Sequence, residues 1–218
     1  MVRKSLSLLA LLACAAWPGF AAADPISFKM LPNYSRATFK ADAPLETIVG
    51  NTAGAGVTGT LTVDPAKPQG ARGTIRVNLD TLSSGVEKRD ADMKGPKYLD
   101  TAAGDENRYA VFEIKSVEVS GPLEPGKQAA AKVSGILTIK GKPVNVVADA
   151  RVTYVKLTRD QLEKDNQKRW GFTADNLKVR ATFVTTLTAH GIPIPEMLTL
   201  KLANDIQLET DLTFVRAQ

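Results

Sequence analysis

Strict alternation of apolar and polar residues recurs along most of this chain and limits what it can fold into. In residues 57–63, Val57, Gly59, Leu61 and Val63 alternate with threonines. The same period of two continues through residues 75–79, 144–154, 177–187 and 206–214. Such a period places successive side chains on opposite faces of a β-strand. The chain is therefore predicted to consist mainly of long, half-buried strands.

Further strands and turns complete an antiparallel pattern. Phe112 and Ile114 begin a strand whose phase slips before Val117 and Val119, which predicts a β-bulge. Shorter strands are expected at residues 35–40, 45–49 and 133–140, and turns at residues 64–65, 121–122, 125–126 and 141–143. The predicted fold class is all-β and antiparallel.

Two segments have the spacing of a helix-capping box. Ser84 precedes Glu87 by three residues, and Thr158 precedes Gln161 by three. In a capping box these paired side chains satisfy each other's free backbone donors, so a short helix is expected after each. The second helix runs into residues 163–169, whose mixed charges predict a solvated excursion between strands.

About eight antiparallel strands with one apolar face usually close into a barrel, because closure removes the unpaired edges. A barrel of this size either is filled by side chains or holds one small ligand. The periodicity alone leaves both possibilities open. The residues predicted to face inward, and to line any cavity, are Ile75, Val77, Leu79, Phe112, Ile114, Val146, Ala148, Phe183, Thr185, Leu208, Thr210 and Leu212.

The N-terminal segment has the composition of a secretory signal peptide. Arg3 and Lys4 precede an uncharged apolar run over residues 5–17, followed by Pro18 and Gly19 and then by small residues up to Ala23. Cleavage after Ala23 is expected, which leaves residues 24–218 as a single exported domain. The alternative is an uncleaved membrane anchor over residues 5–23, but Pro18 and Gly19 would break its helix.

Composition excludes several classes of function. The formal charge of +5 comes from interleaved acidic and basic residues, so no nucleic-acid partner is expected. The only cysteine, Cys14, lies in the predicted leader, and His190 is the only histidine. The exported chain therefore lacks the residues for thiolate chemistry or a histidine metal cluster, and it has no Gly-x-Ser-x-Gly motif. No catalytic residue, metal ligand or cofactor is predicted.

Several segments resemble the YceI-like proteins. They are Gly-Val-Glu-Lys-Arg-Asp-Ala-Asp-Met at 85–93, Tyr-Leu-Asp at 98–100, Tyr-Ala-Val-Phe-Glu-Ile-Lys-Ser at 109–116, Val-Ser-Gly-Ile-Leu-Thr-Ile-Lys-Gly at 133–141, His-Gly-Ile at 190–192, and residues 206–214. The resemblance implies a lipocalin-like barrel in the bacterial periplasm that binds a polyisoprenoid or quinone-like lipid. The chain departs from the pattern at Asp92, where the family often has histidine, and in the longer, charged segment over residues 156–170.

Arg89 and Asp90 invite a catalytic interpretation, but neighbouring helical residues point about 100° apart and so contact different partners. Arg89 is instead expected to pair with a carboxylate and hold its helix against the barrel.

Three functions remain open on the sequence. The first is a soluble exported carrier that buries an amphiphilic lipid. The second is a structural or interaction protein with a filled barrel. The third is an outer-membrane barrel with its apolar face outward, although aromatic residues make up only 6% of the chain and leave few for interfacial girdles. The sequence does not determine the oligomeric state.

Overall fold

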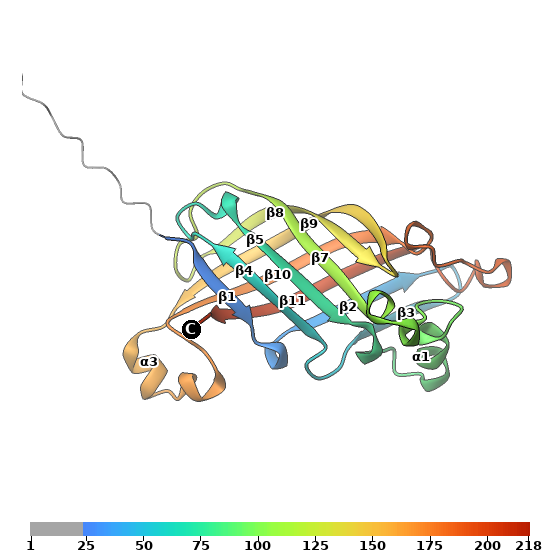
Figure 1. The fold of residues 1–218 in the computed structure, drawn as a ribbon, viewed down its shortest axis with the longest axis horizontal. Helices are drawn as coiled ribbons and strands as arrows, with labels where there is room; N and C mark the ends of the chain where they lie inside the picture. The colour runs from blue at the N-terminus through green and yellow to red at the C-terminus, as the bar shows by residue number, and fades with distance from the viewer. Residues whose placement is uncertain (1–23) are drawn as a thin grey trace, which may run out of the picture.

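The structure, a computed structural model, describes residues 24–218. The predicted leader, with its cleavage after Ala23, lies outside the described residues. All the strands of the described chain belong to one sheet, in which every pairing between strands is antiparallel, as the alternation predicts. The architecture is shown in Figure 1.

Six short strands in the first half of the chain behave as three long strands that are each interrupted once. They are β1 (Ile26–Met30), β2 (Arg36–Asp42), β3 (Thr47–Thr52), β4 (Val57–Val63), β5 (Arg72–Asn78) and β6 (Leu82–Ser83). β1 pairs with β4 and β2 with β3, while β5 continues the sheet from β4 and β6 from β3. Pro32 contributes to the first interruption because it has no N–H for the ladder.

Five uninterrupted strands complete the wall. They are β7 (Tyr109–Val119), β8 (Gln128–Ile139), β9 (Lys142–Lys156), β10 (Asp175–Thr186) and β11 (Asp205–Arg216). β11 pairs with β10 along one edge and with β1 and β2 along the other, which closes an eight-stranded barrel. The predicted bulge is confirmed, because the register of β7 against β8 shifts between Ile114 and Ser116.

Three short α-helices lie outside the wall, one more than expected: α1 (Glu87–Lys94), α2 (Asp105–Arg108) and α3 (Arg159–Glu163). The capping box of α3 is confirmed: Thr158 Oγ1 accepts from the Gln161 N–H at 3.3 Å, and Gln161 Oε1 accepts from the Thr158 N–H at 2.9 Å. Between residues 24 and 218, the helices are all too short or too polar to span a membrane.

The capping box predicted at Ser84 is wrong. The cap position of α1 is Val86, whose side chain makes no cap, because Gly85 has a φ of +80° and separates Ser84 from the helix. Ser84 instead donates from its N–H and its hydroxyl to Asp90 Oδ1 at 2.7 and 2.6 Å. Partial burial acts to raise the pKa of Asp90, but the hydrogen bonds from Ser84 and Ser83 outweigh it and hold that pKa below its usual value.

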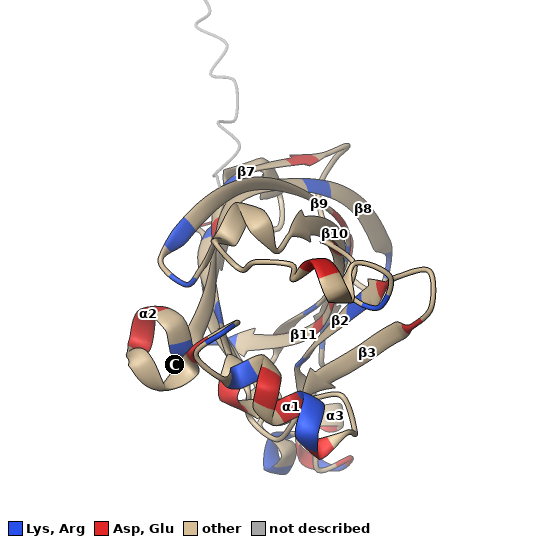
Figure 2. Cartoon of the chain, turned by 90° about the vertical axis from the view of Figure 1, so that its right-hand side faces the viewer, with Lys and Arg blue, Asp and Glu red and all other residues tan. Residues whose placement is uncertain are grey.

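The two ends of the barrel differ. The end that carries α3 and the C-terminus, here called the closed end, contains a packed apolar cluster around Phe28, Leu177 and Phe214. The opposite end, here called the open end, is formed by residues 43–46, 84–108, 140–141 and 187–204, which connect the strands there. Figure 2 shows the ring of strands from this end.

A partly buried polar network joins three strands near the closed end. The Tyr154 hydroxyl on β9 donates to the carboxylate of Asp175 on β10, which also accepts from Arg216 Nη1 on β11 at 3.0 Å. Burial, with the neighbouring carboxylate, raises the pKa of Tyr154 well above its usual value. The phenol therefore stays protonated and available as a donor.

Candidate ligand-binding cavity

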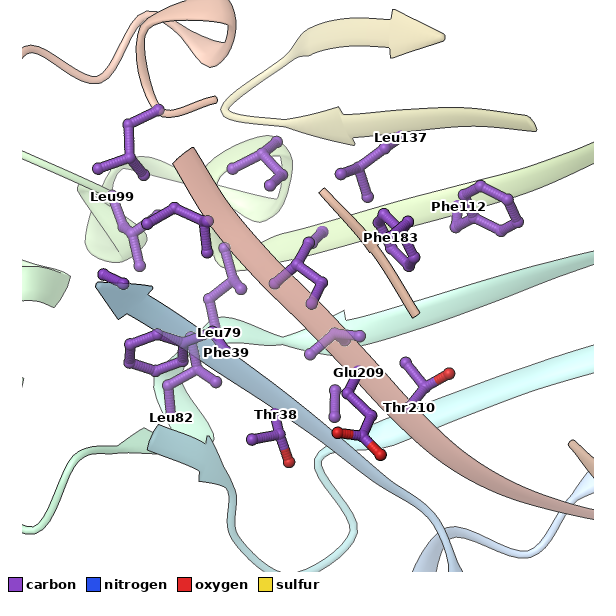
Figure 3. Close-up of a pocket in the computed structure, with 18 of the residues that line it drawn as sticks. Thr38, Phe39, Leu79, Leu82, Leu99, Phe112, Leu137, Phe183, Glu209 and Thr210 are labelled. Atoms are coloured by element: carbon purple, nitrogen blue, oxygen red, sulfur yellow. The ribbon is translucent and has the colours of Figure 1, made fainter. Parts of the chain in front are cut away.

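A cavity of about 410 Å³ lies inside the barrel toward the open end. Its volume falls in the range of about 300–1,000 Å³ that is typical of small-molecule sites. The walls are almost wholly apolar, with aromatic rings, branched aliphatic chains and alanines pointing inward (Figure 3). The solid-core alternative predicts a filled interior, which this half of the barrel does not have.

Ten of the twelve residues predicted from the alternation lie in the cavity wall. β5 and the turn after it, β7, β9, β10 and β11 supply them, so a single inner surface collects residues that are up to 137 positions apart in sequence: Ile75, Val77, Leu79, Phe112, Ile114, Ala148, Phe183, Leu208, Thr210 and Leu212. The hydroxyl of Thr210 is the only polar group among these ten side chains.

Val146 was predicted to line the cavity but does not. Its side chain is buried on the inner face of β9, opposite Gly135 of β8. Gly135 has no side chain, and the ring of Phe112 lies directly over it: a Cβ added there would come within 2.4 Å of the ring. Phe112 in turn stacks on Phe183, with their centroids 5.9 Å apart (Figure 3). The Phe112 ring therefore occupies the space in front of Gly135, next to Val146.

Thr185 is the second predicted lining residue that lies outside the wall. Its hydroxyl is 2.8 Å from Nε2 of His190, which is itself only 1% exposed. Nδ1 of His190 lies 3.0 Å from the carbonyl oxygen of Lys142, so it carries the proton and donates. Nε2 then accepts from Thr185. The alternation predicts that the Thr185 hydroxyl contacts a ligand. It is instead bonded to His190, in the segment after β10.

The histidine is held in its neutral form. Burial lowers the pKa of His190, and the hydrogen bond to Lys142 opposes this only partly. The imidazole thus links β10, the segment after it and the start of β9 near the open end. As expected for a turn or strand-end residue, it ends the short 3-10 turn Thr188–His190 that follows β10.

Connecting segments supply a large part of the wall that sequence reasoning missed. Residues from these segments and from the short strands β2, β3 and β6 close the open half of the cavity: Phe39, Ile48, Leu82, Met93, Leu99, Ile192, Leu198 and Leu202. Leu79, Leu82, Phe39 and Leu99 lie together in Figure 3. The connecting segments lack a regular period, so the only signal was the presence of apolar residues in otherwise polar stretches.

Charged groups occur where the cavity meets solvent. Arg89 on α1 and Glu46 in the β2–β3 turn both line it, and their side chains pair at 2.7 Å. The Arg89 Nε also donates to the Ser84 hydroxyl at 2.8 Å. The expected pairing of Arg89 with a carboxylate is thereby confirmed, and it fastens α1 beside the opening. Asp92 and Lys201 also line this region.

The outer wall carries charged pairs between neighbouring strands. Lys132 pairs with Asp149 across β8 and β9, and Arg180 with Asp211 across β10 and β11. The apolar residues of the same strands point inward. This is the opposite of the arrangement that the outer-membrane alternative requires.

The site has the chemistry of a binding pocket for an apolar chain. Within residues 24–218, no group of three or more histidine, cysteine, aspartate or glutamate side chains is placed to hold a metal ion. The apolar wall can exclude water from a hydrocarbon, which contributes about 0.8 kcal/mol for each methylene buried.

Several solved structures share this fold. BcnA of Burkholderia cenocepacia matches with a TM-score of 0.63 at 15% identity, covering 84% of this chain and 98% of its own. A polyisoprenoid-binding domain from Saccharophagus degradans, implicated in plant cell wall breakdown, matches with a TM-score of 0.62 at 12% identity, covering 88% and 99%. A YceI protein of Campylobacter jejuni matches with a TM-score of 0.57 at 15% identity, covering 78% and 84%.

A comparison with curated proteins gave no significant match. The model of the YceI-like domain, by contrast, matches residues 28–214, which run from the first strand of the barrel to the last. This span includes every segment on which the sequence resemblance was based. The chain therefore belongs to the family of proteins with a YceI-like domain.

Proposed function

We propose that the protein is a soluble exported carrier that holds a polyisoprenoid or a similar amphiphilic lipid, such as a quinone, in the barrel cavity. The observation that carries this proposal is the apolar cavity of about 410 Å³, which has its charged groups where it meets solvent. An amphiphile fits this distribution: its chain is buried among aliphatic and aromatic side chains, and its polar end remains near water.

The family and the fold support the same ligand class. One structure with this fold, from Saccharophagus degradans, is described as a polyisoprenoid-binding domain. The apolar wall gives a physical reason for such a ligand here, because a charged or sugar-like ligand would lose its hydration without gaining matching partners. In this proposal the ligand is carried without forming or breaking a covalent bond.

A direct test is uptake of a fluorescent isoprenoid by delipidated protein. Saturable binding, with competition by unlabelled isoprenoid alcohol, supports the proposal, whereas no uptake at micromolar protein would reject it. Export is tested separately, by the intact mass of the protein in the periplasmic fraction. A chain that begins at Asp24 is expected, and a chain that still carries residues 1–23 would contradict the soluble location.

A further inference from the structure

One helical turn at the open end carries apolar residues on both of its sides. The Leu202 N–H donates to the Leu198 carbonyl at 2.7 Å, and both side chains line the cavity. Met197 and Leu200, three residues apart, are 87% and 55% exposed. A helical segment packed on one side normally presents polar residues on the other. Here Met197 and Leu200 are exposed beside the polar Thr199 and Lys201, and packing within the barrel does not explain these two apolar side chains.

The neighbouring turn extends this apolar surface. Leu45, between β2 and β3, is 68% exposed, and its N–H donates to the carbonyl oxygen of Leu200 at 2.8 Å. Leu45, Met197 and Leu200 are here called the rim patch. Single exposed apolar residues are common on protein surfaces. These three lie on two hydrogen-bonded segments at the mouth of an apolar cavity, which favours a function in ligand entry.

The two segments that carry the rim patch hold few charges of mixed sign, and Arg89 of α1 pairs with Glu46 of one of them at 2.7 Å. Residues 43–46 contribute Glu46, and residues 187–204 contribute Glu196 and Lys201. These segments therefore offer no basic cluster to anionic head groups, and attraction between charges is not a basis for docking. A surface that uses apolar contact instead should bind uncharged lipid and tolerate salt.

We propose that the rim patch docks on the face of a lipid bilayer and that the cavity exchanges its ligand there. The inference rests on the proposed carriage of a lipid. Its structural basis is continuity: Met197 and Leu200 face outward from the same turn whose Leu198 and Leu202 face the cavity. A water-insoluble chain can follow that apolar path from bilayer to cavity without crossing water, whereas a protein partner or a second copy needs no such path.

The test compares two double variants in flotation with phosphatidylcholine vesicles at low and high salt. Met197→Gln with Leu200→Gln alters the rim patch without altering the cavity wall. Val147→Gln with Val184→Gln is the matched control, because both valines are 56% exposed on the outer face of β9 and β10. All chains share one N-terminus, checked by intact mass, so that any contribution of residues 1–23 cancels.

Parent and control are expected to float with vesicles at either salt concentration, and the rim variant to lose roughly tenfold or more in vesicle affinity. All three should take up a short, water-dispersed fluorescent isoprenoid alike when no vesicles are present.

Equal flotation of the rim variant and the parent would overturn the docking proposal, as would a parent that takes up the probe but does not float. A parent that is dimeric in sedimentation, with a monomeric rim variant and no flotation, would assign the patch to a second copy. Flotation without probe uptake by any chain would support docking and reject the proposed carriage.

Discussion

The closed end and the open half of this barrel are built from the same long strands, but only the closed end is filled. At the closed end, large side chains from β1, β10 and β11 meet, and Phe28, Leu177 and Phe214 are at most 1% exposed. Toward the open end, the inner faces of β9 and β10 present alanines instead, at positions 148, 150 and 181. Alternation selects the inward face, whereas side-chain size decides whether the interior is core or cavity.

The closed end should therefore contribute mainly to stability, and the open half mainly to ligand binding. Removing side-chain atoms from a packed interior lowers the stability of the fold, because the space left behind stays empty. A wall that borders open volume makes fewer contacts and is free to contact a ligand. Substitutions at the two sites should separate stability from binding.

The largest expected effect on stability is at the closed end. Phe28→Ala should lower the free energy of unfolding by about 3–5 kcal/mol, because it leaves a cavity in a filled cluster. Phe28 is 1% exposed, belongs to that cluster and does not line the cavity. Denaturant melts of delipidated protein measure this cost. A loss below about 2 kcal/mol would remove the distinction between the two regions.

A charge placed in the open half should act mainly on binding. Leu208→Asp puts an unpaired carboxylate into the apolar wall, where desolvation is costly, and should weaken isoprenoid binding by at least about a hundredfold, or about 2.8 kcal/mol. Gln207→Asp is the control, because residue 207 is exposed and points outward. If both variants fold and bind as the parent does, the cavity is not the binding site.

A smaller effect is expected at the aromatic pair inside the cavity. Phe183→Ala should cost delipidated protein only about 1–2 kcal/mol, because the ring already borders open space. Lipid-loaded protein should lose more, since bound ligand stabilises the fold by mass action and the altered wall binds it less tightly. Melts of both chains, with and without lipid, give the four free energies required. A full-size loss that lipid does not change would place Phe183 in a filled core.

The smallest expected effect is a pH dependence caused by His190. Burial lowers the pKa of this imidazole in the folded protein, while in the unfolded chain it lies near 6.5. As pH falls through about 6.5, His190 binds a proton in the unfolded chain but stays neutral in the folded chain. The free energy of unfolding must then fall, by at most about 1.4 kcal/mol for each pH unit.

The check is a series of melts between pH 7.5 and 5.5 on the parent and on His190→Gln. The variant should be less stable at pH 7.5, because it loses the bonds to Thr185 and Lys142, and its stability should depend less on pH in this interval. Equal slopes for the two proteins would show that His190 does not cause the dependence.

The sequence predicted the closed antiparallel barrel and most of the strand-borne cavity wall, because a period of two determines which side chains share a face. It could not predict which side chains of other segments pack against a given inward-facing residue. Val146 is inward but lies opposite Gly135, which the Phe112 ring covers, and Thr185 is inward but bonded to His190. Both outcomes depend on contacts between segments distant in space or irregular in structure.

The irregular segments were the least predictable. The capping box at Ser84 failed because the positive φ of Gly85 moves the helix start to Glu87, although the four residues have the right types. Leu198 and Leu202 line the cavity from a turn that has no strand period. In both cases the local pattern was present, and the tertiary arrangement determined its role.

The central claim is that the open half of the barrel holds a lipid. Native mass spectrometry of protein purified from its source organism, without added detergent, tests it most directly. The account predicts a species heavier than the polypeptide by the mass of one apolar lipid, which is released on denaturation and is much reduced in Leu208→Asp but not in Gln207→Asp. Bare polypeptide alone, both as purified and after incubation with isoprenoid lipids, would contradict it.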